Sequence, residues 1–322
     1  MAKNEIAITS TTNLGSWTNW ALQEVSADFS AGMIEFDDYS KKCAMDAMSA
    51  IYQLIQNTDK ADIGNMDTSN LRDIVKRCAS LKLSASSYPR EVYFQLRNKQ
   101  INGQWVKEVE MGIEGDGNDA LLRNFGVGVQ KVYPVWLVKE GDSFTYPKRV
   151  GLTVTPPEWE EKGLSSKVIR VVYPVKLTGK DVEYLISERD SVRTNLMAHV
   201  RNNLLNETFG ICESRYKAKP EQLQQIKAKK EEIINALRNC ATVDDMLDCE
   251  LARPYISAAW LDSPESMIVR KMRNNAIKKY PKNFNSIANN SYVELDETYK
   301  TARQEIEENE MSEPFLIEEN EE

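Results

Sequence analysis

Residues 260–282 read WLDSPESMIVRKMRNNAIKKYPK, and no other stretch says more about the fold of this chain. A helix start signal comes first, because the Ser263 hydroxyl can accept from free backbone amides and Pro264 fits the first helical position, where a missing N–H costs nothing. The apolar residues that follow keep roughly helical spacing: Met267, Met272, Ala276 and Tyr280. The sequence therefore predicts a helix over residues 264–280.

The charge of this helix is nearly all of one sign. Against one acid, Glu265, the stretch carries six basic residues: Arg270, Lys271, Arg273, Lys278, Lys279 and Lys282. Lys271 and Lys278 are about two helical turns apart, so they share one side of the helix. A helix of one sign in a chain that is acidic overall predicts an anionic partner.

The acidic residues of the chain are concentrated at its two ends. The whole sequence has a net charge of −8, and residues 301–322 alone contribute −8 through nine Glu and one Arg. Residues 1–60 hold eight acids and four Lys, which leaves a charge of +4 for residues 61–300. The overall acidity is therefore compatible with a middle region that faces a polyanion.

Length and composition are typical of a soluble protein with a substantial core. A chain of 322 residues with 41% hydrophobic residues can form one large domain or two smaller ones. No apolar run approaches the roughly 20 residues that cross a bilayer, and the first residues lack a secretory signal pattern. The five cysteines are scattered without a CxxC pair, as in proteins with reduced thiols. We expect a cytoplasmic location.

The order of the predicted elements indicates the fold class. Helices over 39–57 and 71–81 precede strands over 91–97 and 104–113, which Asn102-Gly103 joins as a hairpin. A short helix over 116–125 is followed by strands over 128–139, 143–146, 150–154 and 168–176. Helices are predicted again over 180–187, 190–205, 220–239 and 243–251. This order predicts an α+β fold in which a small antiparallel sheet is flanked by helices.

Composition suggests three regions. Residues 1–35 are rich in Ser, Thr, Asn and Ala, and we expect an N-terminal arm with a possible oligomer contact. Residues 36–290 are expected to form the folded core. Residues 291–322 are polar and then strongly acidic, which predicts a disordered tail. Within that tail, residues 314–317 read PFLI and form a candidate docking peptide.

Motifs for nucleotide binding or hydrolysis are missing from the sequence. It contains no HExxH, no P-loop pattern and no GxSxG. The one histidine, His199, lies in a predicted helix and is interpreted as a packing residue. Four acids crowd one turn and leave a metal site open as an alternative: Glu110, Glu114, Asp116 and Asp119.

Basic and aromatic residues are interleaved through the strand-rich block. Cationic side chains can hold a phosphate backbone without reading sequence, and aromatic faces can stack on unpaired bases. The candidate phosphate-binding residues here are Lys131, Lys148, Arg149, Lys167 and Arg170, with Tyr93 as a candidate for base stacking. For each of these residues taken singly, a solvated or packing role is the simpler interpretation.

Four motifs occur in an order that resembles one protein family. Trp260, Pro264, Met267, Lys271 and Lys278 are separated by four, three, four and seven residues. Residues 78–94 look like a helix end, a turn and a "vyf" strand, residues 109–115 look like a "gykG" turn, and residues 138–144 look like a "v..gD.F" strand. In these features, over roughly residues 70–285, the chain resembles the Redβ/RecT superfamily of phage single-strand DNA annealing proteins.

The chain departs from this family pattern in two places. A basic residue follows the proline in Redβ-like members, whereas Glu265 stands here, so that phosphate contact is either absent or supplied elsewhere. A helical insertion near 206–258 looks longer than in the family. The positions of Lys271 and Lys278 therefore depend on the local motif.

The resemblance implies a function and a site. Family members bind single-stranded DNA in a basic groove, assemble into rings or helical filaments, and anneal complementary strands without ATP. It implies DNA contacts by Lys271 and Lys278, with Arg270, Arg273 and Lys279 beside them. Expected partners are single-stranded DNA, annealed duplex, further copies of the chain, and a host single-strand-binding protein or phage exonuclease. No cofactor is expected, although Mg²⁺ dependence of DNA binding stays open.

Two other classes of function remain as alternatives. One is a basic-patch nucleic-acid-binding or phage structural protein without annealing activity. The other is a metal-dependent nuclease that uses the four acids of the 110–119 turn. A further hypothesis gives the acidic tail a role, either in competing with DNA for the groove or in mimicking an acidic tail bound by a partner.

Overall fold

The computed structural model describes residues 14–32, 35–59, 61, 66–101, 104–163 and 165–295. The chain divides into two compact units, and each of them is built from segments that are not consecutive in the sequence. The described part of unit 1 comes from residues 14–132, 175–180 and 277–295, and that of unit 2 from residues 133–174 and 181–276. The fold is mixed α+β with small antiparallel sheets, as expected, but its core is divided between two units.

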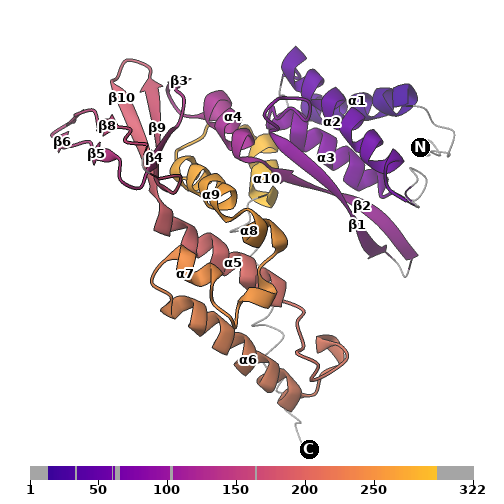
Figure 1. Cartoon of the computed structure of the whole chain (residues 1–322). Helices are drawn as coiled ribbons and strands as arrows, with labels where there is room; N and C mark the ends of the chain where they lie inside the picture. Colours follow the sequence, from indigo (N-terminus) through magenta and orange to yellow (C-terminus); the bar gives the residue numbers. More distant parts are fainter. Residues whose placement is uncertain are drawn as a thin grey trace, which may run out of the picture. The chain divides into compact units, whose positions relative to one another are not determined.

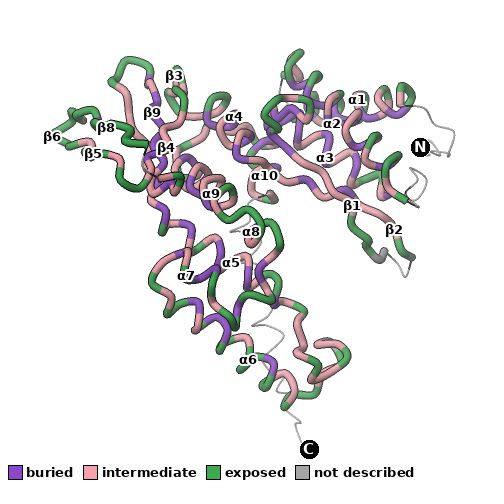
Figure 2. Tube along the Cα trace, in the orientation of Figure 1, coloured by how far each residue is buried: buried purple, intermediate pink, exposed green. Residues whose placement is uncertain are grey.

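Three helices build one side of unit 1: α1 (Leu14–Ala31), α2 (Asp38–Gln56) and α3 (Thr68–Ser80). The Asp37 and Asp67 side chains accept backbone N–H groups at the starts of α2 and α3, which satisfies amides that the helix leaves free. Figure 2 shows that the inward sides of all three helices are buried. The helices predicted over 39–57 and 71–81 are confirmed.

Helix α1 differs from the expected N-terminal arm. Trp17, Ala21, Val25 and Phe29 recur every four residues, and all four are buried in the core of unit 1. A helix with such a stripe must pack it against other elements, and α2 and α3 provide that surface. Residues 14–31 are thus part of the core, while residues 1–13 lie outside the described residues.

The core of unit 1 is completed by a long hairpin, with β1 (Val92–Ile101) antiparallel to β2 (Gln104–Ile113). Alternate residues, among them Val92, Val109 and Met111, face the helices and are buried (Figure 1). On the other face Tyr93 is paired with Gly112, and a Cβ added at Gly112 would lie 2.1 Å from the tyrosine ring. The predicted strand pair is confirmed; Asn102-Gly103 lies outside the described residues.

The remaining elements of unit 1 are α4 (Gly115–Phe125), β3 (Val129–Val132) and α10 (Ser286–Leu295). Ser291 of α10 is buried and its hydroxyl meets Ser80 of α3 at 3.2 Å. The sequence had assigned residues 291–295 to the acidic tail. They belong instead to a packed helix. The predicted disorder of residues 296–322 lies outside the described residues.

A four-stranded antiparallel sheet contains β3, β4 (Trp136–Lys139), β9 (Val168–Leu177) and β10 (Val182–Glu188). Strand β9 belongs to both units: its last residues pair with β3 in unit 1, and its first residues pair with β4 in unit 2. The helix predicted over 180–187 is wrong, because this segment is the strand β10. Val182, Leu185 and Ile186 fit helical spacing locally, but β9 offers a free edge for strand pairing.

Two small hairpins extend unit 2. Strand β5 (Ser143–Thr145) pairs with β8 (Glu158–Glu160), and β6 (Arg149–Val150) pairs with β7 (Thr153–Val154). The predicted strand over 150–154 is therefore two short strands joined by a turn. That turn contains Gly151 at φ +60°, a conformation that glycine adopts without steric cost.

Helices form the rest of unit 2. They are α5 (Arg193–Leu204), α6 (Pro220–Asn239), α7 (Val243–Leu247), α8 (Ala258–Asp262) and α9 (Pro264–Lys278), whose last two residues belong to unit 1. Short 3₁₀ turns lie at Arg189–Val192, Arg215–Lys217 and Arg253–Tyr255. The helical stretch near 206–258 packs against α5. No helix in the described part of the chain has the length and apolar character to cross a membrane.

Gly117 gives a test of how α4 sits in unit 1. The Glu91 carbonyl accepts from the Glu114 amide at 2.9 Å, and a Cβ at Gly117 would lie 2.1 Å from the same carbonyl oxygen. We expect Gly117→Ala to lower the free energy of unfolding by about 1–3 kcal/mol because backbone must shift, although alanine is the better helix former by ~1 kcal/mol. Urea unfolding measures this. Asn124→Ala, on the exposed side of the same helix, is the control; it removes only a 3.4 Å hydrogen bond to the Lys82 carbonyl, so the change should stay below about 1 kcal/mol. An unchanged or more stable Gly117→Ala protein would contradict the prediction.

Candidate nucleic-acid interface

Helix α9 exists as predicted and begins at Pro264. The Ser263 carbonyl accepts from the Met267 amide at 3.1 Å, which places Ser263 at the start of the helix. The residues that α9 buries are Ile268, Met272 and Ile277. Of the four apolar residues that gave the helical spacing, Met267, Met272, Ala276 and Tyr280, only Met272 is buried. The apolar run of residues 267–269 fits two registers, and its neighbours in the fold favour Ile268.

A stripe of α9 next to the buried face borders an open hollow of about 270 Å³ in unit 2. Its lining residues recur at spacings of three and four, so they lie on one side of the helix: Glu265, Ser266, Val269, Arg270 and Arg273. Two of the predicted cations, Arg270 and Arg273, are thus brought together. The hydroxyl of Ser266 adds a neutral hydrogen-bond donor. Ser266 was not among the predicted site residues, although it lies four residues before Arg270 and so on the same side of the helix.

The acid that lines this hollow is bound by the protein itself. The Glu265 carboxylate accepts from Arg189 Nη1 at 2.8 Å and from the Val168 amide at 2.7 Å. Glu265 therefore joins the start of α9 to the start of β9. The departure from the family pattern at this position has a structural role here, since the carboxylate charge is compensated inside unit 2.

Arg189 is the centre of this network. Its side chain is buried, and it donates to both carboxylate oxygens of Asp244 at 3.0 and 2.7 Å and to the Val168 carbonyl at 2.9 Å. A guanidinium that forks onto a carboxylate in this way fixes geometry as well as charge. Lys167, a predicted phosphate-binding residue, lies 2.9 Å from Asp244 and belongs to the same network. Hydrogen bonds from Arg189 and Lys167 hold the pKa of Asp244 below its usual range.

The other cations of the 264–282 stretch differ in their surroundings. Arg273 Nε donates to the buried Tyr173 hydroxyl at 2.8 Å, so this arginine also ties α9 to β9. Lys271 and Lys278 are half-buried, and Lys279 is exposed. In unit 1, Lys282 donates to three carbonyls at the end of α9, those of Ile277, Lys278 and Tyr280. Burial, with Lys278 nearby, lowers the pKa of Lys282 to about 8.

Trp260, the first residue of the family-like motif, is fully buried. It packs against His199 of α5, with the ring centroids 6.0 Å apart. His199 Nε2 accepts from the Ser257 amide at 3.1 Å, just before α8. The interpretation of His199 as a packing residue is confirmed, and together His199 and Trp260 position the segment that leads into α9.

The remaining predicted site residues occupy three kinds of environment. The Arg170 guanidinium lies 4.4 Å from the rings of both Phe144 and Tyr146, and its Nε donates to Glu188 at 2.7 Å. Tyr93 lies over Gly112 on the outer face of the β1–β2 hairpin. Lys148 and Arg149 are exposed around β6, and Lys131 is exposed on β3. Several aromatic residues of the strand block thus pack within the protein, whereas Tyr88, Trp105, Tyr133 and Tyr146 are exposed.

The acids proposed for a metal site do not converge. Among the described residues, no group of three or more His, Cys, Asp or Glu side chains is placed to hold a metal ion. Glu110 instead accepts from Arg97 Nε at 2.7 Å and from Gln95 at 2.9 Å. The arrangement gives no support to the nuclease alternative.

Comparison of the chain with protein-family models, with curated proteins and with solved structures finds no match. The functional interpretation therefore depends on the chemistry of the residues described above.

The Arg189 network leads to a prediction about pH. Asp244→Asn should lower the free energy of unfolding at pH 7 by about 1–3 kcal/mol, because Arg189 loses a charged partner. Because the pKa of Asp244 is lowered in the folded state, its contribution is complete above the ordinary aspartate pKa of about 3.9 and disappears as pH falls through the lower folded value. The difference between wild type and variant should therefore shrink as pH falls below about 4.

Thermal or urea unfolding of both proteins across this pH range tests the prediction. Asp248→Asn is the matched control, since that carboxylate is 86% exposed and lies 3.9 Å from Arg253. We expect little change from this substitution at any pH. A difference between wild type and Asp244→Asn that stays constant down to low pH would show that the carboxylate charge does not matter.

Proposed function

We propose that this protein binds single-stranded DNA and anneals complementary strands without ATP, as a phage-type recombination protein. The observation that carries the proposal is the hollow on α9. There Arg270, Arg273 and Ser266 line one stripe of a helix, and the lining acid, Glu265, is already bound to Arg189. Donors of this kind suit the phosphate groups of a nucleic-acid backbone and carry no sequence preference.

In the proposed mechanism the protein only positions a DNA strand and holds it by opposite charge. Cations on α9 grip one strand by its phosphates and leave the base edges free, so that a second strand can test pairing. Matched bases then supply the driving force through stacking, about 1.4 kcal/mol per step on average. No bond is made or broken, which agrees with a sequence that has no P-loop and no hydrolase motif.

Lys271 and Lys278 extend this proposed surface along α9. Their spacing of seven residues puts them on one side of the helix, next to the stripe that contains Arg270. By resemblance to the Redβ/RecT superfamily, they would contact neighbouring phosphates. The same resemblance supports a ring or filament of copies in the cytoplasm of a bacterial host, with a host single-strand-binding protein or a phage exonuclease as a further partner.

The DNA-binding proposal has a direct test by fluorescence anisotropy of a labelled oligonucleotide. Lys271→Ala, Lys278→Ala and Arg270→Ala should each weaken binding of single-stranded DNA. Each lost phosphate contact should also flatten the slope of log affinity against log salt by about 0.7. Lys162→Ala makes the same charge change at a lysine that pairs with Glu160 at 2.6 Å, and it should leave both quantities unchanged.

Annealing is measured with two complementary oligonucleotides that are added in turn, without ATP and with or without Mg²⁺. The wild-type protein should accelerate duplex formation, and the three α9 variants should do so less at moderate salt. Variants that bind and anneal like the wild type would remove α9 as the site. Binding without any acceleration of annealing would favour the basic-patch binding protein instead.

A further inference from the structure

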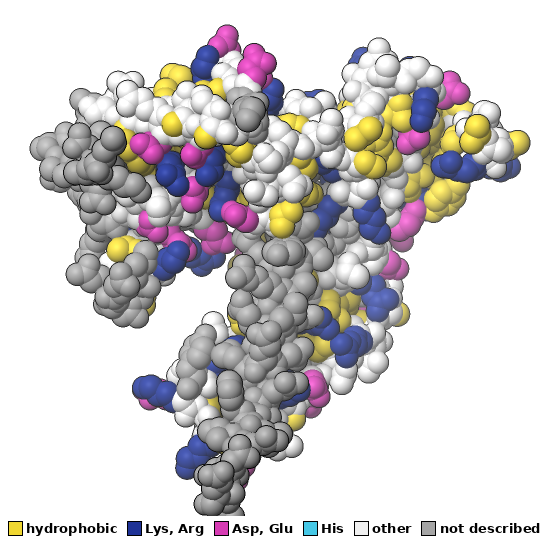
Figure 3. Space-filling view, turned by 180° about the vertical axis from the view of Figure 1, so that it is seen from behind, with side chains coloured by type: hydrophobic (Ala, Val, Ile, Leu, Met, Phe, Trp, Pro, Cys, Tyr) yellow, Lys and Arg dark blue, Asp and Glu magenta, His cyan; other side chains and the backbone are white. Residues whose placement is uncertain are grey.

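A small hairpin in unit 2 exposes apolar and basic side chains together. We use the name β6–β7 tip for residues 148–153. Within it Leu152 is fully exposed and Val150 is 68% exposed, and Lys148 and Arg149 are exposed beside them. Figure 3 shows basic and hydrophobic side chains next to each other at the outer end of this region. Exposed apolar side chains that are rimmed by charged residues can mark an interaction site.

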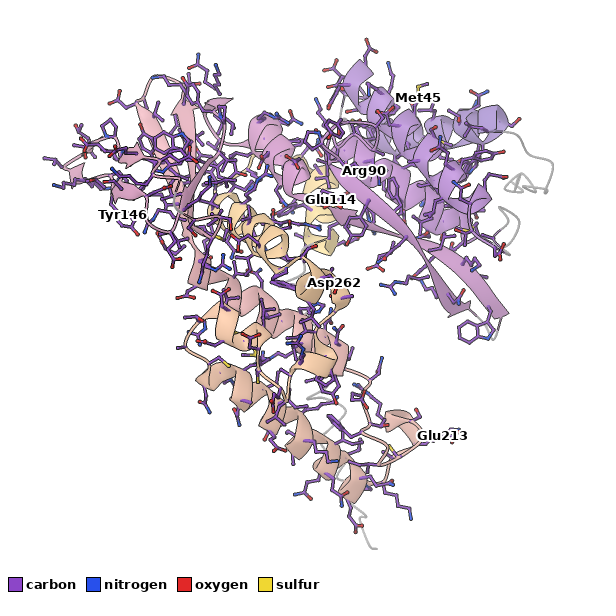
Figure 4. The ribbon with its side chains drawn as sticks, in the orientation of Figure 1. Met45, Arg90, Glu114, Tyr146, Glu213 and Asp262 are labelled. Carbon is purple, nitrogen blue, oxygen red and sulfur yellow. The ribbon has the colours of Figure 1, made fainter. Side chains whose placement is uncertain are left out.

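Side-chain and backbone contacts anchor the tip at its base. The Arg170 guanidinium packs on the rings of Phe144 and Tyr146, and it donates to Glu188 and to the Tyr146 hydroxyl. Tyr146, labelled in Figure 4, donates to Glu188 at 2.7 Å. Across the base of the tip, the Thr155 amide donates to the Lys148 carbonyl at 2.8 Å. The exposure of Leu152 is therefore a property of an anchored hairpin.

The charge of the tip is positive. Residues 143–157 contain Lys148 and Arg149 and no acid. In the part of the chain that the structure describes, neither side chain has an ion-pair partner. A partner for this surface must therefore combine negative charge with apolar side chains.

The sequence itself contains a segment with this combination. Residues 313–319 read EPFLIEE, so that three apolar residues are flanked by acids on both sides. Residues 305–322 as a whole hold nine Glu and no basic residue. Phe315, Leu316 and Ile317 match the apolar pair of the tip, and the flanking glutamates match Lys148 and Arg149.

We propose that the segment 313–319 docks on the β6–β7 tip. Apolar contacts with Val150 and Leu152 would supply the affinity, and charge pairs would set the orientation. A nucleic-acid strand fits the tip less well, because bases stack on aromatic faces and the tip offers two aliphatic side chains. Seventeen residues separate Leu295 from Glu313, so the segment is covalently linked to the chain that carries the tip.

Docking has a consequence for the proposed function. Lys148 and Arg149 are among the cations expected to contact DNA, so an occupied tip would be closed to a strand. The acidic segment would then be displaced as DNA binds. This consequence rests on the proposed DNA binding, whereas the docking itself does not.

Photo-crosslinking in the full-length chain tests the docking directly. A benzophenone amino acid replaces Phe315, the protein is irradiated, and the crosslinked peptides are identified by mass spectrometry. We expect the crosslink to map to residues 148–153. Val150→Ser with Leu152→Ser should reduce it about tenfold, the change expected when burial of roughly one leucine side chain is lost. High salt should weaken it as well.

Controls separate docking from nonspecific contact. Leu251→Ser removes an exposed apolar residue elsewhere in unit 2 and should leave the crosslink unchanged. The tip positions are exposed, so Val150→Ser with Leu152→Ser should keep the thermal unfolding midpoint of the wild type. A mixture of isotope-labelled and unlabelled chains tells whether the segment docks on its own chain or on another copy, and either result supports the proposal.

Two outcomes would overturn the docking. One is a crosslink that maps elsewhere or persists in the tip double variant. The other is the absence of any crosslink to the tip, together with weaker oligonucleotide binding by the double variant, which would assign the tip to nucleic acid. If the crosslink forms but no oligonucleotide binds, the docking stands and the proposed function fails. If oligonucleotides anneal and lower the yield of the crosslink when they are added before irradiation, both stand.

Discussion

The buried guanidinium of Arg189 is the constraint on which unit 2 depends. A buried charge is tolerated only where partners replace its lost hydration, and Arg189 obtains them from Asp244, Glu265 and the Val168 carbonyl. These partners come from α7, α9 and β9. The single cation therefore fixes the start of the basic helix against a strand and a second helix, and it determines which side of α9 remains outside.

The same network explains why an acid can stand at the start of a helix that we propose to hold DNA. Glu265 would repel phosphate if it were solvated, but both of its oxygens accept hydrogen bonds inside the unit. Among the described residues that line the hollow beside it, Glu265 is the one acid, and Arg270, Arg273 and Ser266 are the polar side chains that remain. Glu265 thus serves the scaffold of unit 2 and leaves the exposed side of α9 positive.

Some basic residues of this chain hold the fold together and others are exposed to a partner. The sequence alone does not distinguish the two roles. Arg170, Arg189 and Lys282 are held by rings, carboxylates and helix carbonyls of their own unit. Lys148 and Arg149 project from an anchored hairpin. A count of basic residues therefore overstates the surface available to a polyanion. Lys148 and Arg149 gain importance, because the apolar residues beside them favour a partner that is both acidic and hydrophobic.

Local chemistry determined a large part of this fold. Pro264 set the start of α9, helical periodicity set α2 and α3, and alternating residues around Asn102-Gly103 set the β1–β2 pair. These signals act between near neighbours in the chain, so the sequence alone expresses them. The cationic character of α9 was visible for the same reason.

The tertiary structure decided everything that depends on distant partners. Residues 182–188 became a strand because β9 offered an edge, and residues 14–31 became a core helix because α2 and α3 could cover Trp17 and Phe29. Ile268 faces inward where Met267 had been expected, and Arg170 and Lys167 found acidic or aromatic partners far away in sequence. Burial and charge pairing depend on surfaces that folding brings together. A short stretch of sequence does not contain both partners of such a contact, so it cannot predict them.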